Sequence, residues 1–167
     1  YLENSHHPEK VTYKTPLLKP ILDVTYGCIV YQEQVMEIVR KLAGYSYGRA
    51  DLVRRAMSKK KLDVMAQERE YFVHGKVDEN GNLELPGAVR NGVPEKIANE
   101  IFDEMRSFAS YAFNKSHAAA YAFVAYQTAY LKTLYPVEYM ASLISTVDDT
   151  DKINRYITNC KEMKIDC

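Results

Sequence analysis

The feature that most constrains the fold is a run of apolar residues at helical spacing that ends in a glycine. The run consists of Val35, Ile38, Val39 and Leu42, three or four positions apart. This spacing repeats on one side of an α-helix, so the run predicts a helix with one buried face. Gly44 follows at the position where a helix usually stops.

The same period continues through most of the chain. We expect further helices over about 49–59 and 63–73, from Pro94 through Phe108, from Ser116 to the residue before Pro136, and over about 137–147 and 150–163. The glycine-rich stretch 75–92 interrupts them with an Asn-Gly turn pair between short apolar alternations, which predicts a small hairpin or loop. The predicted fold class is therefore mainly α, a multi-helix subdomain with one small hairpin or loop insertion.

Local signals predict details of three of these helices. In the helix over about 49–59, Leu52, Val53, Ala56 and Met57 are expected on the buried side. The Ser116 hydroxyl is expected to cap the long helix, and an acid of the sequence DDTD is expected to cap the last one.

The length of 167 residues corresponds to about one domain. We expect residues 1–20, rich in polar groups and prolines, to form an extended lead-in. Residues 21–147 form the helical subdomain in this interpretation, and residues 148–167 a last helix with a continuation cut from its context. The first residue is not methionine, so we expect the chain to be part of something longer.

Composition excludes several classes of protein. Lys plus Arg and Asp plus Glu balance at 22 each, so the chain lacks the global basic field of a non-specific nucleic-acid binder and any anion site must be local. Three cysteines without C-x-x-C spacing argue against a disulfide framework and a zinc site, and favour a reducing cytoplasm. No apolar run approaches the roughly 18 residues of a membrane span.

The sequence ADLVRRAMSKKK concentrates positive charge in a neutral chain. On a helix, Asp51, Arg54, Arg55 and Lys59 fall within an arc of roughly 140°. A bound polyanion is one explanation of this cluster. The other is structural: Asp51 pairs with Arg55 four positions on, and the lysines stabilise the negative end of the helix.

A second polar cluster stands at the start of the predicted long helix. It consists of Asn114, Lys115, Ser116 and His117. A helix N-terminus presents unpaired N–H groups and a partial positive charge, so it accepts phosphate readily. A histidine beside a cap can also be purely structural, but two cationic helix-end clusters in a neutral chain favour a phosphate-bearing ligand.

Three long blocks carry a resemblance to a known family. They are YGCIVYQEQVMEIVRKLAGYS, ADLVRRAMSKKK and FNKSHAAAYAFVAYQTAYLKTLYPVEYMASL. Together they resemble the fingers region of the bacterial replicative polymerases of family C, the alpha subunits of DNA polymerase III. The resemblance extends from about Thr12 to the closing NCKEMKI.

This resemblance implies a fingers subdomain that binds the incoming deoxynucleoside triphosphate and the template during DNA replication. Residues 1–20 would then follow the junction between palm and fingers. The residues placed at the nucleotide by this resemblance are Arg54, Arg55, Lys59, Asn114, Lys115, Ser116 and His117, and those assigned to the DNA are Lys60 and Lys61.

The catalytic carboxylates of the family lie in the palm, N-terminal to the matching segment. They hold the Mg²⁺ ions of nucleotidyl transfer, so we expect no catalytic or metal-binding residue in this chain and no polymerase activity from it alone. Asp148, Asp149 and Asp151 are interpreted as a capping cluster. The expected partners are primer–template DNA, deoxynucleoside triphosphates, the rest of the polymerase chain and, through regions outside it, replisome subunits such as the sliding clamp. No membrane association is expected.

Two alternatives from other classes remain at this point. One is a helical interaction module that docks a protein partner through tyrosine and lysine surfaces. The other is a stand-alone single-strand-binding domain that combines tyrosine stacking with a basic groove.

Overall fold

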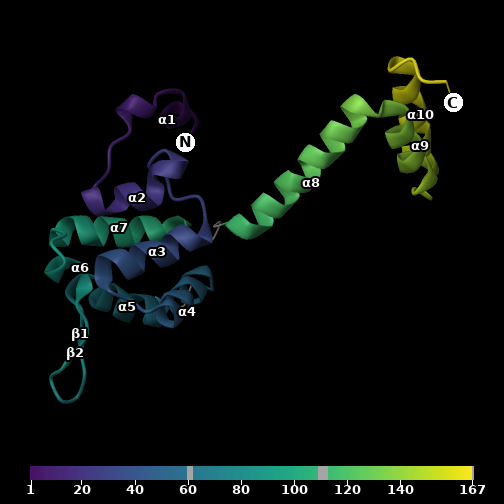
Figure 1. The fold of residues 1–167 in the computed structure, drawn as a ribbon. Helices are drawn as coiled ribbons and strands as arrows, with labels where there is room; N and C mark the ends of the chain where they lie inside the picture. The colour runs from purple at the N-terminus through teal and green to yellow at the C-terminus, as the bar shows by residue number, and fades with distance from the viewer. Residues whose placement is uncertain (60–61, 109–112, 167) are drawn as a thin grey trace. The chain divides into compact units, whose positions relative to one another are not determined.

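The computed structural model describes residues 1–59, 62–108 and 113–166. These residues are mainly helical, with one small antiparallel hairpin, so the predicted fold class is confirmed (Figure 1). The chain divides into two compact units, Tyr1–Lys115 and Ser116–Cys167. None of the described helices combines the length and the apolar character that crossing a bilayer requires.

The first unit begins with short helical segments and continues with longer helices. Its α-helices are α1 (Leu2–His6), α2 (Lys19–Leu22), α3 (Gln32–Ala43), α4 (Tyr47–Ser58), α5 (Leu62–His74), α6 (Gly87–Arg90) and α7 (Glu95–Phe108), and three 3₁₀ turns cover Pro8–Lys10, Pro16–Leu18 and Asp23–Thr25. The central element is α3, which packs against α2, α4, α5 and α6 (Figure 1).

The buried face of α3 is the one that its apolar spacing predicts. Val35, Ile38, Val39 and Leu42 are almost wholly buried. Gly44 ends the helix in the left-handed conformation, with a φ of 78°, and its N–H returns to the carbonyl of the last turn. Both predictions for this helix are confirmed.

The helices α5 and α7 complete the core of the first unit. Phe72 of α5 and Phe102 of α7 are fully buried, and their ring centroids lie 5.6 Å apart. Ile101 and Met105 of α7 are also fully buried. Such aromatic and aliphatic packing is the main stabilising contribution in a unit of this size.

One predicted core position of α4 is wrong. Val53, Ala56 and Met57 are buried, whereas Leu52 is 67% exposed. The buried stripe of α4 starts at Ala50, one turn before Val53. Leu52 lies beyond the edge of this stripe, because each residue turns the helix by about 100°.

The predicted hairpin is confirmed as β1 (Lys76–Val77) paired antiparallel with β2 (Leu83–Leu85). Its turn is organised by Asp78, whose Oδ1 accepts from the N–H groups of Asn80 at 2.9 Å and Asn82 at 2.8 Å. At its base, Gly75 and Gly87 bring two backbone segments into close contact, since a Cβ built on Gly87 would lie 2.3 Å from the nitrogen of Gly75.

The second unit consists of α8 (Lys115–Leu134), which begins at the last residue of the first unit, α9 (Pro136–Ser145) and α10 (Thr150–Glu162). Ser116 lies inside α8 rather than before it, so its predicted role as the cap is wrong. The predicted acidic cap of the last helix is confirmed, because Asp149 Oδ1 accepts from the N–H of Lys152 at 3.0 Å.

Candidate functional site

The arginine pair of α4 is organised by one carboxylate. Arg54 donates from Nε and Nη2 to Asp51 Oδ1 at 3.0 and 2.6 Å, and Arg55 donates from Nε to Asp51 Oδ2 at 2.8 Å. The hydrogen bond from Arg54, more than the charges nearby, lowers the pKa of Asp51 below its usual value. The pairing of Asp51 with Arg55 that the structural explanation predicted is therefore present, and Arg54 shares it.

The two arginine side chains differ in their exposure and in the number of groups that hold them. The side chain of Arg54 is 20% exposed, and a third donor, Nη1, reaches Gln32 Oε1 at 3.0 Å. The side chain of Arg55 is 64% exposed. Arg54 is thus held in one orientation by two partners, whereas Arg55 retains most of its surface for a ligand.

A second arginine network fixes α4 to its neighbours. Arg49 donates to Glu68 of α5 at 2.9 Å and to Glu84 of β2 at 3.3 Å. Glu68 also accepts from the hydroxyl of Tyr45 at 2.9 Å, and burial, more than this neighbouring charge, raises the pKa of Tyr45. These contacts position the helix that carries the arginine pair.

The N-terminus of α3 holds the segment that leads into α8. The N–H of Gln32 donates to the carbonyl of Phe113 at 2.9 Å, and the N–H of Phe113 donates to Val30 at 3.4 Å. The carboxylate of Glu33 accepts from the N–H of Lys115 at 3.1 and 3.2 Å. Glu33 therefore satisfies the first amide of α8, a role that the sequence had suggested for Ser116.

Gln32 and Glu33 are consecutive residues, so the start of α3 contacts one residue of each predicted cluster, Arg54 and Lys115. Arg54 reaches the side chain of Gln32, while the backbone of Lys115 reaches Glu33. The ammonium of Lys115 lies 5.6 Å from the centroid of the Tyr31 ring, a cation–π arrangement at the same helix end.

The other predicted site residues are less closely connected. Lys59 is exposed where α4 ends, and Asn114 is exposed just before α8. Ser116 and His117 belong to the second unit, where the His117 ring packs against Tyr121 with centroids 4.6 Å apart. Lys60 and Lys61 lie outside the described residues.

A surface cavity of about 580 Å³ adjoins this helix end within the first unit. One wall is apolar and comes from residues 16–24. The other wall contains Glu33, Glu37, Lys41 and Lys115. One predicted site residue, Lys115, therefore borders a space large enough for a small ligand.

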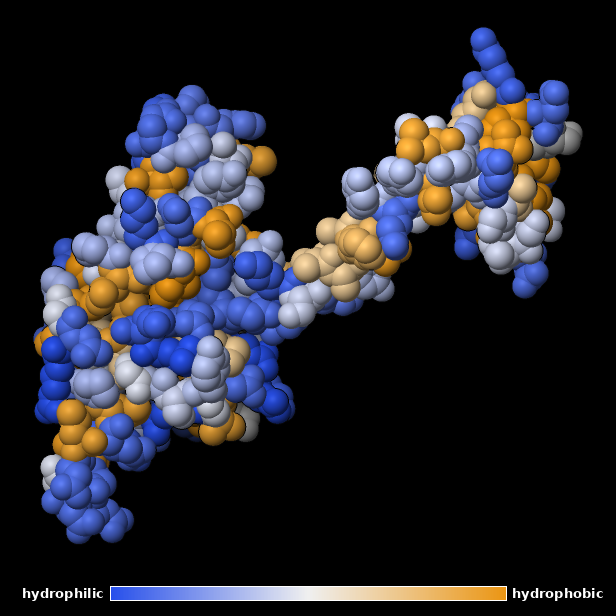
Figure 2. Space-filling view, in the orientation of Figure 1, coloured by the Kyte–Doolittle hydropathy of each residue, from blue (hydrophilic) through white to orange (hydrophobic). Residues whose placement is uncertain are grey.

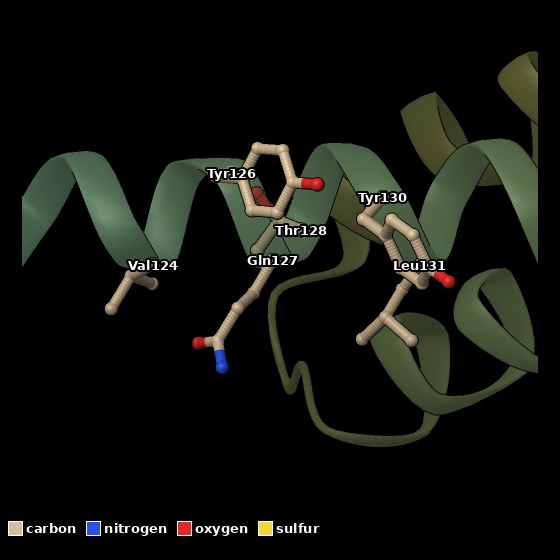
Figure 3. Close-up of a pocket in the computed structure, with 6 residues that line it drawn as sticks. All are labelled: Val124, Tyr126, Gln127, Thr128, Tyr130 and Leu131. Carbon is tan, nitrogen blue, oxygen red and sulfur yellow. The ribbon is translucent and has the colours of Figure 1, made fainter.

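A second hollow lies away from all predicted site residues. Figure 3 shows its six lining side chains, all from α8, with the rings of Tyr126 and Tyr130 standing off the same helix. Because a single helix provides every wall, this hollow is an uncovered helix surface rather than an enclosed site.

Metal-ligating side chains are not gathered into a cluster in the part of the chain that the structure describes. No group of three or more metal-ligating side chains occurs among residues 1–59, 62–108 and 113–166. Two carboxylates of this region are already engaged: Asp51 by two guanidinium groups, and Glu33, the residue after Gln32, by a backbone amide. Their environment is therefore unlike an open cation site.

Sequence comparison decides the family. Residues 1–80 match the sequence profile of the bacterial DNA polymerase III alpha subunit finger domain. The chain is 47% identical over 171 residues to the DNA polymerase III alpha subunit of Thermus aquaticus, 48% over 169 residues to that of Pasteurella multocida and 45% over 171 residues to that of Buchnera aphidicola. The chain belongs to the DNA polymerase III alpha subunit family.

The matches cover nearly the whole of this chain but little of the relatives. The three alignments include 98–99% of the chain and 13–14% of the length of each alpha subunit. The chain therefore corresponds to a segment of a DNA polymerase III alpha subunit, and its residues 1–80 match the finger domain.

Gln32 and Glu33 are the site residues that sequence reasoning missed. Glu33 carried one usable signal, an acid in the first turn of a predicted helix, but that signal suggests stabilisation of its own helix rather than of α8. Gln32 carried none, because its contact with Arg54 joins residues 22 positions apart.

Proposed function

We propose that this chain is the fingers part of a DNA-directed DNA polymerase, in which Arg54 and Arg55 bind the triphosphate of the incoming deoxynucleotide. The observation that carries the proposal is that the side chain of Arg55 stays 64% exposed next to Arg54, which Asp51 and Gln32 hold in one orientation. A triphosphate has about four negative charges, and a planar guanidinium can donate to two phosphate oxygens at once. An arginine that is already oriented loses less conformational entropy when it binds.

The two arginines have different parts in this proposal. Arg54, held by Asp51 and Gln32, provides a fixed positive charge. Arg55, more exposed, turns toward the phosphates and stabilises the charge that develops on the pyrophosphate leaving group. Lys59 provides a further positive charge, and Lys60 and Lys61 follow it in the sequence as proposed contacts for the DNA backbone.

The resemblance to the fingers region also assigns nucleotide contacts to residues around the start of α8. Asn114, Lys115, Ser116 and His117 provide a cation, polar groups and a ring close to a helix N-terminus. The Mg²⁺ ions that accelerate nucleotidyl transfer in such polymerases would be held by palm carboxylates outside this segment, as the resemblance to family C implies.

Kinetics of the full-length polymerase test the proposal. We expect Arg54→Ala and Arg55→Ala each to reduce kcat/KM for the deoxynucleotide roughly 10- to 150-fold, which corresponds to about 1.5–3 kcal/mol for one charge-assisted contact. The Kd for primer–template should change little. Arg90→Ala, at an exposed arginine outside the site, is the matched control. Equal losses in nucleotide use and in DNA binding would show that the two arginines contact the DNA backbone rather than the triphosphate.

The segment alone should not polymerise. We propose this because the resemblance to the family C polymerases places the catalytic carboxylates in the palm, outside this segment. The purified 167-residue chain, supplied with primer–template, Mg²⁺ and all four deoxynucleotides, should show no primer extension. Extension that persists through further purification would overturn the assignment of the catalytic carboxylates to another part of the polymerase.

A further inference from the structure

Arg49 joins three elements of the first unit through one side chain. Its guanidinium donates from Nη2 to Glu68 of α5 at 2.9 Å and from Nη1 to Glu84 of β2 at 3.3 Å. Its Cζ atom also lies 5.2 Å from the ring centroids of both Tyr45 and Tyr71. One residue in the first turn of α4 therefore contacts the segment before this helix, α5 and the hairpin.

The hairpin is not suited to bind phosphates itself. Residues 77–84 contain three acids and no Lys or Arg, and Figure 2 shows hydrophilic colouring at the end of the hairpin. The cation that precedes them, Lys76, is already paired with Glu84, from Nζ to Oε2 at 2.5 Å. Phosphate binding depends on cations, so any effect of the hairpin on a bound nucleotide must be exerted through another element.

Polar contacts help to fix the rotation of α4 about its axis. Two of its four buried residues are alanines, and such short side chains interdigitate little with a neighbouring helix. Arg49 is held at both its backbone and its side chain, because its N–H also donates to Ser46 Oγ at 3.3 Å. Arg54 and Arg55 follow roughly 7.5–9 Å further along the same helix, so a rotation at Arg49 displaces both of them.

We propose that Arg49 is a positioning residue for nucleotide binding, and that the hairpin acts on the arginine pair through the contact between Glu84 and Arg49. This inference rests on the proposed function, in which Arg54 and Arg55 bind the triphosphate. Arg49 is not a third ligand of the phosphates, because two carboxylates already accept from its guanidinium. Its effect is on where the other two arginines lie.

Two variants of the hairpin in the full-length polymerase separate this link from the stability of the hairpin. Glu84→Gln weakens both the ion pair with Lys76 and the ion pair with Arg49. Lys76→Gln, the matched control, removes the first and leaves the second, because Lys76 and Arg49 contact different oxygens of Glu84. Steady-state kinetics give KM and kcat for the deoxynucleotide, and a binding titration gives the Kd for primer–template.

We expect Glu84→Gln to raise KM for the deoxynucleotide about 2- to 5-fold, the range of one partly exposed ion pair, with little change in kcat or in the Kd for primer–template. KM is the decisive readout, because the triphosphate is charged before the reaction, whereas a smaller folded fraction would lower kcat instead. Lys76→Gln should leave KM unchanged. Equal rises in KM in both variants would overturn the proposal, since hairpin stability would then account for the effect.

A double variant tests whether Glu84 acts through Arg49. Arg49→Lys keeps the charge but loses the planar fork that reaches two carboxylates, so it should raise KM at least as much as Glu84→Gln does. Adding Glu84→Gln to Arg49→Lys should have almost no further effect. Additive rises in KM would show that the two residues act independently, and would overturn the link.

Hydrogen exchange of the full-length polymerase distinguishes failure of this inference from failure of the proposed function. Without DNA or nucleotide, Glu84→Gln should accelerate exchange in residues 50–58 about 2- to 5-fold, and Lys76→Gln should not. Unchanged exchange would overturn the link between the hairpin and α4, whatever this helix binds. Faster exchange with unchanged KM would overturn the positioning role; if Arg54→Ala then leaves KM unchanged as well, the proposed function fails with it.

Discussion

Arg54 and Gln32, 22 positions apart in the sequence, are joined by a hydrogen bond of 3.0 Å from the guanidinium Nη1 to the amide Oε1. The contact links α4, which carries the arginine pair, to the first residue of α3. Because the backbone of Gln32 also donates to Phe113, one residue contacts both the arginine helix and the segment that leads into α8.

The first prediction concerns Gln32. In the full-length polymerase, we expect Gln32→Ala to lower kcat/KM for the deoxynucleotide about 2- to 12-fold, which corresponds to the roughly 0.5–1.5 kcal/mol of one hydrogen bond that water partly replaces. Steady-state kinetics also provide the control: on an Arg54→Ala background, Gln32→Ala should have almost no further effect. Additive losses in the double variant would show that Gln32 does not act through Arg54.

The second prediction concerns the pKa of Asp51. The hydrogen bond from Arg54 lowers it from the model-peptide value of 3.8. A carboxyl group whose folded-state pKa is lowered stabilises the fold above its unfolded pKa, and this contribution is lost as the pH falls through the folded value. For Asp51, the stabilising contribution is therefore lost below about pH 4.

An NMR titration of the Asp51 carboxyl group checks which of the two arginines lowers its pKa more. Arg54→Ala should raise its pKa toward 3.8, and Arg55→Ala should raise it less, because the hydrogen bond from Arg54 is the largest cause of the shift. A larger rise in the Arg55→Ala variant would reverse the order.

The parts of the fold that sequence predicts well are those that depend on local spacing. The buried face of α3 and its end at Gly44 follow from apolar period and glycine conformation. Asp149 as a cap follows from side-chain chemistry close to its own helix. In each case the deciding contacts lie within a few residues.

The misplaced residues depend on contacts from distant segments. Leu52 is apolar and close to the buried stripe, but the width of that stripe is set by the neighbours of α4. Ser116 has the chemistry of a cap, yet α8 begins at Lys115, whose amide meets the carboxylate of Glu33 from 82 positions away. No local pattern encodes such a contact, and this also explains why Gln32 was missed.

The third prediction concerns the glycines at the base of the hairpin. Gly75→Ala and Gly87→Ala combine a positive φ with a Cβ placed 2.3–2.4 Å from backbone atoms. We expect each to destabilise the hairpin by about 1–3 kcal/mol, seen as roughly 5- to 150-fold faster hydrogen exchange in residues 71–90 of the full-length polymerase.

Gly81→Ala is the matched control for this pair. Gly81 also has a positive φ, of 79°, but a Cβ there would meet no atom within 4 Å. Gly81→Ala introduces the backbone strain without the clash, so we expect it to accelerate hydrogen exchange less than Gly75→Ala and Gly87→Ala do. Equal acceleration in all three variants would show that the close contact contributes nothing.

The last prediction concerns His117, in the first turn of α8. Its exposed ring packs against Tyr121 on the same helix, so the imidazole is supported by its own helix. At a nucleotide site such a ring has two uses. It can donate a hydrogen bond to a phosphate, helped by the helix N-terminus, or occupy the space that a ribose 2′-hydroxyl needs.

The two uses give different results for His117→Ala in the full-length polymerase. Phosphate binding predicts an equal fall in kcat/KM for deoxyribonucleotides and ribonucleotides. Sugar discrimination predicts a rise in ribonucleotide use relative to deoxyribonucleotide use, and we expect this outcome, because in the proposed function Lys115 and the two arginines already provide cations for the phosphates. The measurement is the ratio of the two kcat/KM values in wild type and variant, with Tyr121→Ala as a second variant that removes the ring supporting His117. An unchanged ratio with normal efficiency would leave His117 with a structural role alone.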